Sequence, residues 1–141
     1  MSQENVEIVR ALYESLNDRD WDRFREMCDP DVELRGTIGG LEEHRLIRGV
    51  AGIRRVTEEE DTEIWEEHVV EPRKLIDAGD QVVVLQREYD RGKSSGVELI
   101  VDMAAVIDVR DGRVVRVQPY MDAAAALKAV GLSRREAHAD P

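Results

Sequence analysis

The sequence contains a single cysteine, Cys28, and no apolar run long enough to cross a bilayer. One cysteine excludes an intrachain disulfide, and a reducing cytoplasm is then the expected compartment. A membrane-spanning helix needs roughly 20 predominantly apolar residues, and no segment approaches that length. The opening Met-Ser-Gln-Glu-Asn lacks the basic start and apolar stretch of a signal peptide. We therefore expect a cytoplasmic protein with no membrane partner.

Clusters of lysine and arginine are also missing. The 31 acidic residues outnumber the 20 basic ones, and the formal net charge is -11. A nucleic-acid backbone would be repelled by this overall charge, and no local cluster of basic residues could overcome it. Nucleic acid is therefore excluded as a partner, and the acidic excess is interpreted as a solvated surface that keeps the protein soluble.

Motifs for a metal ion or a phosphate group are absent as well. His44, His68 and His138 show no ligand spacing, so the sequence predicts no metal site. The glycines at residues 36–40 lack the lysine and the strand-to-helix context of a phosphate loop. Cys28 has no evident base nearby and is interpreted as a small core residue. We therefore expect a protein without a cofactor.

The 141 residues, 42% of them hydrophobic and 36% charged, are typical of one globular domain. We place the domain at residues 1–132 and a flexible tail at residues 133–141. Apolar residues recur at helical spacing near the N-terminus, and cap and stop residues delimit further helices. The predicted helices are 2–17, 20–28, 50–60 and 122–130.

The second half of the chain is rich in β-branched residues and is divided by glycine-containing turns. The predicted strands are 32–34, 65–76, 81–89, 97–109 and 113–120. Helices followed by a long antiparallel meander define an α+β fold. Both faces of the meander are substantially apolar, which a sheet with one face in water would not need.

The turn at Asp111 and Gly112 predicts the register of the last hairpin. A two-residue turn there pairs Val109 with Val114 and Ile107 with Arg116, and directly paired residues share a face. With odd-to-odd pairing in the preceding hairpin as well, one face mixes aliphatic and polar groups. Its predicted members are Val83, Leu85, Arg87, Tyr89, Met103, Ala105, Ile107, Arg116, Gln118 and Tyr120. We assign this face to a pocket and the opposite, smoother face to a homodimer interface.

Arg87 and Arg116 are the sharpest candidates for ligand binding. Two guanidinium groups in an apolar cup could hold a carboxylate or an enolate oxygen. The alternative is that both pair with acids of the helices or of the sheet rim. Tyrosine hydroxyls could bind a ligand carbonyl, and a tryptophan could form a wall. The predicted pocket residues are Tyr13, Trp65, Arg87, Tyr89, Met103, Arg116, Gln118 and Tyr120.

Asp102 is the candidate catalytic residue, because it stands between Val101 and Met103 in an otherwise apolar strand. Burial would raise its pKa and suit it to general acid or base catalysis. The predicted register places Asp102 on the interface face, where an ion pair with an arginine is the alternative. A one-residue bulge would instead move it into the pocket beside Arg87.

Several segments in a fixed order resemble one known family. They are residues 9–17, 20–22, 29–34, 48–53, 77–80, 110–114 and 120–132. Together they are similar to SnoaL-like proteins of the nuclear transport factor 2-like superfamily, which includes the ketosteroid isomerases. The resemblance implies a cone-shaped fold, in which a curved, mostly antiparallel sheet, three N-terminal-side helices and a short C-terminal helix enclose a pocket. It also implies dimerisation through the outer face of the sheet.

The resemblance leaves binding and catalysis as alternatives. Leu12 and residues 34–36 occupy the positions where ketosteroid isomerases carry their catalytic tyrosine and aspartate, so that chemistry is not expected. Arg87 and Asp102 partly match the epoxide hydrolases of the superfamily, and Asp102 alone matches the acid/base of the SnoaL-like cyclases. We predict a protein whose pocket binds a small, largely apolar molecule, with anionic molecules among the candidates. The alternative is a cofactor-free isomerase, polyketide-cyclase-like or epoxide-hydrolase-like enzyme.

Overall fold

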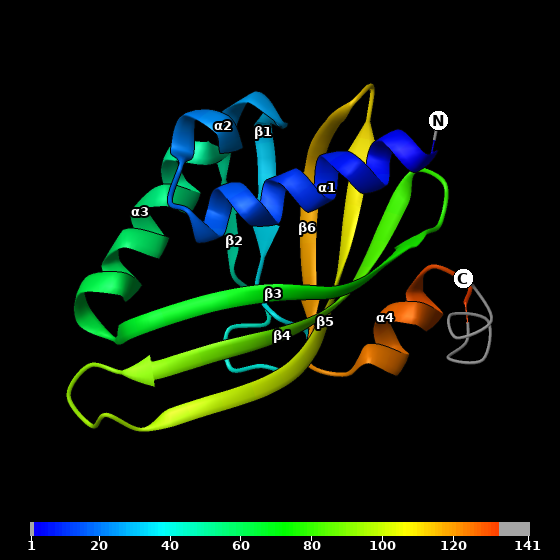
Figure 1. The fold of residues 1–141 in the computed structure, drawn as a ribbon. Helices are drawn as coiled ribbons and strands as arrows, with labels where there is room; N and C mark the ends of the chain where they lie inside the picture. Colours follow the sequence, from blue (N-terminus) through cyan, green and yellow to red (C-terminus); the bar gives the residue numbers. More distant parts are fainter. Residues whose placement is uncertain (1, 133–141) are drawn as a thin grey trace.

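The computed structural model describes residues 2–132 of the chain, and the predicted tail at residues 133–141 lies outside them. The predicted α+β fold is confirmed: helices and strands build a curved sheet flanked by helices (Figure 1). In chain order the elements are α1 (Ser2–Asn17), α2 (Trp21–Glu26), β1 (Cys28–Arg35), β2 (Leu46–Arg48), α3 (Gly49–Glu63), β3 (Trp65–Asp77), β4 (Gln81–Gly92), β5 (Glu98–Arg110), β6 (Arg113–Tyr120) and α4 (Ala123–Ala129).

The six strands form one mostly antiparallel sheet in the order β2-β1-β6-β5-β4-β3. Among the pairs of neighbouring strands, only β1 and β6 run parallel, and they are joined through the long meander rather than by a hairpin. Figure 1 shows α1 lying across one face of the bent sheet, with α3 beside it and close to the start of β3. We call this the inner face.

The element boundaries follow local sequence signals where those signals are strong. Asp20 caps α2 by accepting a hydrogen bond from the backbone of Arg23, and Asp122 caps α4 in the same way. The predicted extension of the second helix to Cys28 is wrong, since Cys28 already pairs with Val114 of β6. The short strand β2 was not predicted, because it exists only through pairing with β1.

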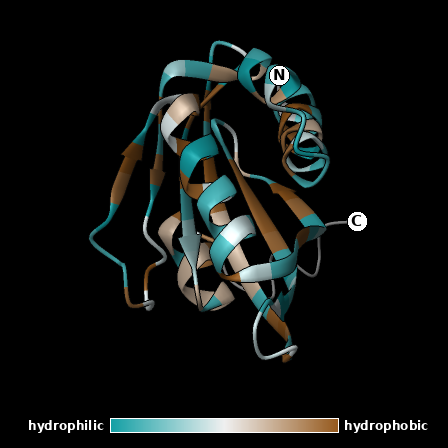
Figure 2. Cartoon of the chain, turned by 90° about the vertical axis from the view of Figure 1, so that its left-hand side faces the viewer, coloured by the Kyte–Doolittle hydropathy of each residue, from teal (hydrophilic) through white to brown (hydrophobic). Residues whose placement is uncertain are grey.

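Both faces of the sheet are covered, by different helices. On the inner face, residues of α1, α2 and α3 such as Val9, Phe24 and Ile53 pack against β4, β5 and β6. On the outer face, Ala126 and Leu127 of α4 pack against the opposite side of the same strands. Figure 2, in which α3 is turned toward the viewer, shows hydrophilic residues on this helix and hydrophobic ones on strands behind it. The apolar character of both sheet faces is thus explained.

The predicted strand register is wrong in two places. Between β4 and β5 the pairing is odd-to-even, with Val84 opposite Ala105, because the pair next to the turn is Arg91 with Glu98. The Asp111–Gly112 turn forms as predicted, and Val109 pairs with Val114. A bulge then inserts one residue into β6, so that Asp108 rather than Ile107 lies opposite Arg116.

Each slip by one residue moves side chains to the other face of the sheet. The odd residues of β5 stay on the inner face as predicted. The even residues of β4, and Val117 and Pro119 of β6, join them there. The predicted members Val83, Leu85, Arg87, Tyr89, Arg116, Gln118 and Tyr120 lie on the outer face instead.

Candidate functional site

A cavity of about 180 Å³ lies between the inner face of the sheet and helices α1, α2 and α3. Most of its wall is aliphatic or aromatic, with Leu12, Leu16, Phe24, Ile53, Ala105 and Val117 among the lining residues. The cavity continues into a wider mouth of about 500 Å³, which shares Leu34, Val56 and Pro119 with it. An apolar enclosure of this kind favours an apolar ligand.

One buried hydrogen bond connects α1 to β4 at the end of the cavity away from its mouth. The hydroxyl of Tyr13 on α1 donates to Oε1 of Gln86 on β4 at 2.5 Å, and both side chains are buried. Burial, and secondarily the charge of Glu88, raises the pKa of Tyr13 well above its usual value. Tyr13 therefore remains a neutral donor, and it lies at the cavity as predicted.

Four ionisable side chains gather where the cavity meets its mouth. His68 on β3 and Asp90 on β4 are cross-strand partners, and Nδ1 of His68 is hydrogen-bonded to Oδ1 of Asp90. Glu88 precedes Asp90 by two residues on the same face of β4, and Glu60 reaches the site from α3. We call Glu60, His68, Glu88 and Asp90 the rim cluster.

Two further predicted residues lie beside the rim cluster. Trp65 and Met103 both line the mouth, as predicted for pocket residues. The indole of Trp65 stacks on the imidazole of His68 with the ring centroids 6.1 Å apart and the planes 13° from parallel. Stacking on one face and a hydrogen bond at Nδ1 together hold the His68 ring, and they leave Nε2 as the nitrogen that can act on a bound molecule.

The carboxyl groups of Glu60 and Glu88 are held in an unfavourable setting. Burial raises the pKa of each above its usual value. The neighbouring acids raise the pKa of Glu88 further, while His68 opposes both shifts. No lysine or arginine lines the inner cavity among residues 2–132.

The mouth does contain two arginines. Arg35 and Arg45 are each engaged by a glutamate, Arg35 with Glu33 at 3.1 Å and Arg45 with Glu42 at 2.8 Å. Arg45 also acts on Glu60, whose pKa it lowers, and three of the four groups of the rim cluster are acids.

Metal ligation is within reach of part of the rim cluster. Nδ1 or Nε2 of His68 and one oxygen each of Glu88 and Asp90 lie within 4.8 Å of one another. Imidazole and carboxylate groups are ligands of several divalent ions. The prediction of no metal site considered only the spacing of the histidines along the chain, and this group is assembled from two strands.

Arg87 and Asp102, the residues expected to drive catalysis, lie outside the cavity. They face each other on the outer face, where Arg87 Nε donates to Asp102 Oδ1 at 2.7 Å and Nη2 donates to Oδ2 at 3.2 Å. The Arg87 guanidinium lowers the pKa of Asp102, opposite to the rise expected on burial. The ion pair weighed as the alternative for Asp102 is therefore what the structure contains, and Tyr89 lies on the same side of β4.

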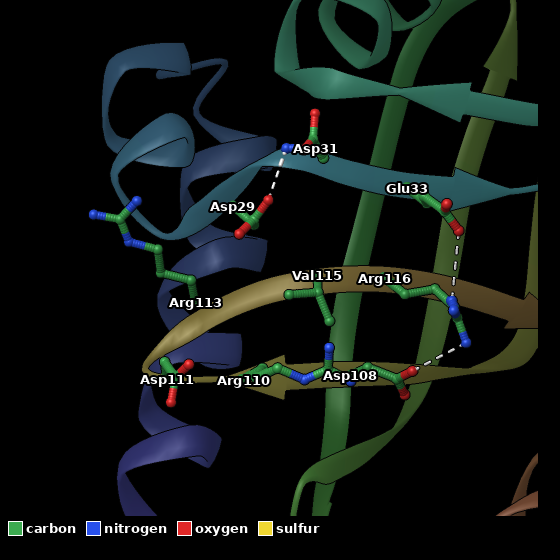
Figure 3. Close-up of a pocket in the computed structure, with 9 residues that line it drawn as sticks. All are labelled: Asp29, Asp31, Glu33, Asp108, Arg110, Asp111, Arg113, Val115 and Arg116. Carbon is green, nitrogen blue, oxygen red and sulfur yellow. Dashed lines mark hydrogen bonds and ion pairs between the residues drawn. The ribbon is translucent and has the colours of Figure 1, made fainter.

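Arg116 also lies outside the cavity, in a hollow on the surface of the sheet (Figure 3). Its guanidinium lies between Glu33 at 3.6 Å and Asp108 at 3.4 Å. The hollow is lined by charged side chains, with Val115 as the one apolar residue among those that line it. Gln118 donates to the backbone carbonyl of Gly36 at 3.0 Å, and Tyr120 packs in the outer core. Assigning Arg87, Tyr89, Arg116, Gln118 and Tyr120 to the pocket was thus wrong.

The rim cluster itself was missed by reasoning from the sequence. Gln86, Glu88 and Asp90 alternate with outward-facing residues of β4, which is the signal that an odd-to-even register would have placed in the pocket. Glu60 belongs to the acidic excess that was interpreted as a solvated surface. It is half-buried, because α3 turns this side toward the cavity.

The fold matches that of solved proteins described as nuclear transport factor 2-like or ketosteroid isomerase-like. Within this class the chain belongs to the SnoaL-like domain family, whose family model matches residues 9–117. The resemblance stated from the sequence is thereby confirmed. No curated protein matches the sequence. Within residues 2–132, no helix is long and apolar enough to span a membrane.

Three solved structures illustrate the similarity. TerC co-crystallized with polyporic acid is 27% identical, with a TM-score of 0.73 over 90% of this chain and 98% of TerC. A nuclear transport factor 2-like protein of unknown function from Burkholderia pseudomallei is 23% identical, with a TM-score of 0.72 over 91% of this chain and 98% of its own. An LEH-like epoxide hydrolase from M. tuberculosis is 17% identical, with a TM-score of 0.68 over 86% and 84%.

Proposed function

We propose that this protein binds a small, largely apolar molecule in the inner cavity, with the polar end of the molecule directed toward the rim cluster. The proposal rests on the way apolar and ionisable residues are distributed around the cavity. Apolar walls surround the cavity, whereas its ionisable groups are gathered at the side that leads to the mouth. Small-molecule sites combine an apolar wall with a few placed polar groups in this way.

The size of the enclosure limits the ligand. A cavity of about 180 Å³ holds the apolar body of a small molecule, and the mouth of about 500 Å³ accommodates a larger remainder. The expectation of an anionic ligand rested on Arg87 and Arg116. Because both lie outside the cavity and are paired with acids, we do not retain it.

Calorimetric titration with polyporic acid, the molecule crystallised with TerC, and with the smaller benzyl alcohol tests the proposal. The informative variant is Val117→Phe, which fills the cavity from β6. Its matched control is Val115→Phe, two residues earlier on the same strand, where the side chain faces the outer hollow. We expect at least one probe to bind the wild type and the control but not Val117→Phe. Equal binding to all three proteins would place the ligand elsewhere and refute the proposal.

A second candidate, catalysis of proton transfer, is favoured by the contact between His68 and Asp90. With the Nδ1–H of neutral His68 donating to Asp90, the Nε2 lone pair can take a proton from a carbon next to a carbonyl group. An acid such as Glu88, whose pKa is raised, can return a proton to another atom of the same ligand. The net reaction is an isomerisation or the proton transfer of a cyclisation, and it needs no cofactor.

This candidate has a direct readout once a carbonyl ligand of the cavity is identified. In D2O, the wild type should exchange the α-protons of that ligand for deuterium, followed by NMR. His68→Gln should bind the ligand and exchange it slowly, while His44→Gln, on an exposed loop, behaves as the wild type. Exchange that is unaffected in His68→Gln would leave binding as the function.

The predicted homodimer remains a proposal for the outer face. Part of this face is already covered by α4, and Ile100 on β5 is 65% exposed next to the Arg87–Asp102 pair. Apolar residues in such a position favour contact with a second copy of the chain. Light scattering at micromolar concentration should give twice the mass of one chain, and the mass of a single chain would contradict the proposal.

A further inference from the structure

The carboxyl groups of the two glutamates of the rim cluster have no direct partner among the described residues, although the nearby His68 acts on both and Arg45 acts on Glu60. Asp90 is joined to His68, but within residues 2–132 no hydrogen bond or ion pair engages the carboxyl group of Glu60 or Glu88. Both groups nevertheless line the apolar cavity. Half-buried carboxylates without a direct partner are unfavourable, because charges that do not contact them offset only part of the desolvation.

From this arrangement we infer that the cavity prefers a ligand with a cationic end, an organic ammonium compound whose apolar body lies against Ala105 and Val117 and whose charged nitrogen lies between Glu60 and Glu88. The inference names the ligand class of the proposed function and rests on it. An ammonium group has hydrogen-bond donors and a positive charge, and both carboxylates are acceptors.

The surroundings of Glu60 and Glu88 support this ligand class. Burial raises the pKa of each, nearby acids raise it further, and a cation placed between the two carboxylates would lower it again. Within the described residues no lysine or arginine lines the inner cavity, and the two arginines of the mouth contact Glu33 and Glu42, although Arg45 also lowers the pKa of Glu60. An anionic ligand would be repelled by the carboxylates of Glu60 and Glu88.

The apolar wall decides between an organic cation and a bare metal ion. His68, Glu88 and Asp90 could hold a metal, but a metal would leave the cavity behind them unfilled. A molecule with an apolar body and a cationic end satisfies both parts of the enclosure at once. The proposed preference is electrostatic. Ligands of equal shape and unequal charge should therefore differ in affinity.

Three probes of nearly equal size separate charge from shape. Benzylammonium is cationic at neutral pH, benzyl alcohol is neutral, and benzoate is anionic. In calorimetric titrations of the full chain we expect benzylammonium to bind at least about tenfold more tightly than benzyl alcohol, the scale of a hydrogen bond to a charged group. Benzoate should bind most weakly of the three.

Glutamine substitutions identify which glutamates cause the preference for a cationic probe. Glu88→Gln keeps the shape of the side chain and removes its charge, so benzylammonium should lose its advantage over benzyl alcohol. Glu60→Gln on α3 tests the same point from the other side of the cavity and serves if Glu88→Gln does not fold. Glu67→Gln is the matched control, since Glu67 is exposed on β3 and pairs with Arg91. This control should preserve the full order of the three probes.

Three other outcomes would contradict the inference, and one of them would also contradict the proposed function. Binding of benzoate as tight as that of benzylammonium overturns the cation preference and leaves the proposed apolar cavity standing. An advantage lost equally in Glu67→Gln attributes it to the overall negative charge and also overturns the inference. Failure of all three probes to bind contradicts the proposed function itself, and the inference with it.

Discussion

His68 and Asp90 face each other across strands β3 and β4, and the hydrogen bond between His68 Nδ1 and Asp90 Oδ1 closes one side of the rim cluster. The pair is well buried: the side chain of His68 is 18% exposed and that of Asp90 7%. We therefore expect the pair to contribute to stability.

Asp90→Ala should lower the free energy of unfolding by about 1–3 kcal/mol, because Nδ1 of His68 loses its buried partner. Urea denaturation measures the change. Glu67→Ala is the control, because its ion pair with Arg91 is exposed and such pairs contribute little. Equal stability of Asp90→Ala and the wild type would show that water replaces the contact at no cost.

Tyr13→Phe should be destabilising by about 1–3 kcal/mol, because Oε1 of Gln86 is left buried without its donor. Replacing both partners, as in Tyr13→Phe with Gln86→Met, removes both polar groups and should cost less than the two single substitutions together. Urea denaturation of the four proteins gives the coupling free energy. Strictly additive costs would mean that the two side chains do not depend on each other.

Glu88 gives the stability a dependence on pH with a defined sign. Burial raises its pKa above the ordinary 4.5, so the folded protein binds more protons than the unfolded chain between 4.5 and the raised value. The free energy of unfolding therefore falls as the pH rises through this window. Glu88→Gln should be more stable than the wild type above the window and similar to it below 4.5.

Urea denaturation over a series of pH values measures this crossover. Glu98→Gln, an exposed residue at the start of β5, is the control and should follow the wild type. A Glu88→Gln variant that is less stable than the wild type at neutral pH would show that the Glu88 carboxylate is stabilised by a partner in the folded protein.

Asp102→Asn should leave ligand binding unchanged, because Asp102 and its partner Arg87 lie on the outer face of the sheet. The lowered pKa of Asp102 means that its ion pair adds stability at neutral pH and loses this contribution as the pH falls through that lowered value. The effect is small because the pair is solvent-screened. Calorimetric titration checks the binding, and a loss of affinity would return Asp102 to the site.

Much of the fold could be predicted from the sequence, because local signals specify it. The bounds of α1, the caps at Asp20 and Asp122 and the turn at Asp111 and Gly112 all depend on residues close together in the chain. The short strand β2 could not be predicted in this way, since its three residues are held by β1 rather than by their own pattern.

The site was predicted less well, for a reason that lies in two strand connections. The bulge beside Val115 and the odd-to-even pairing of β4 with β5 each shift a strand by one residue. The pairing of β4 with β5 moved Arg87 out of the cavity and Glu88 into it, and the bulge did the same for Arg116 and Val117. Tyr13, Trp65 and Met103 line the cavity or its mouth, because their positions do not depend on these two connections, and their contact with a ligand stays a prediction.

The most direct test of the account is the crystal structure of the protein with the tightest binding of the three benzyl probes. We predict that the aromatic ring lies in the inner cavity against Ala105 and Val117, and that the polar end lies within hydrogen-bonding distance of the rim cluster. A probe bound instead in the outer groove beside Arg87 and Asp102 would contradict the assignment of the cavity as the functional site.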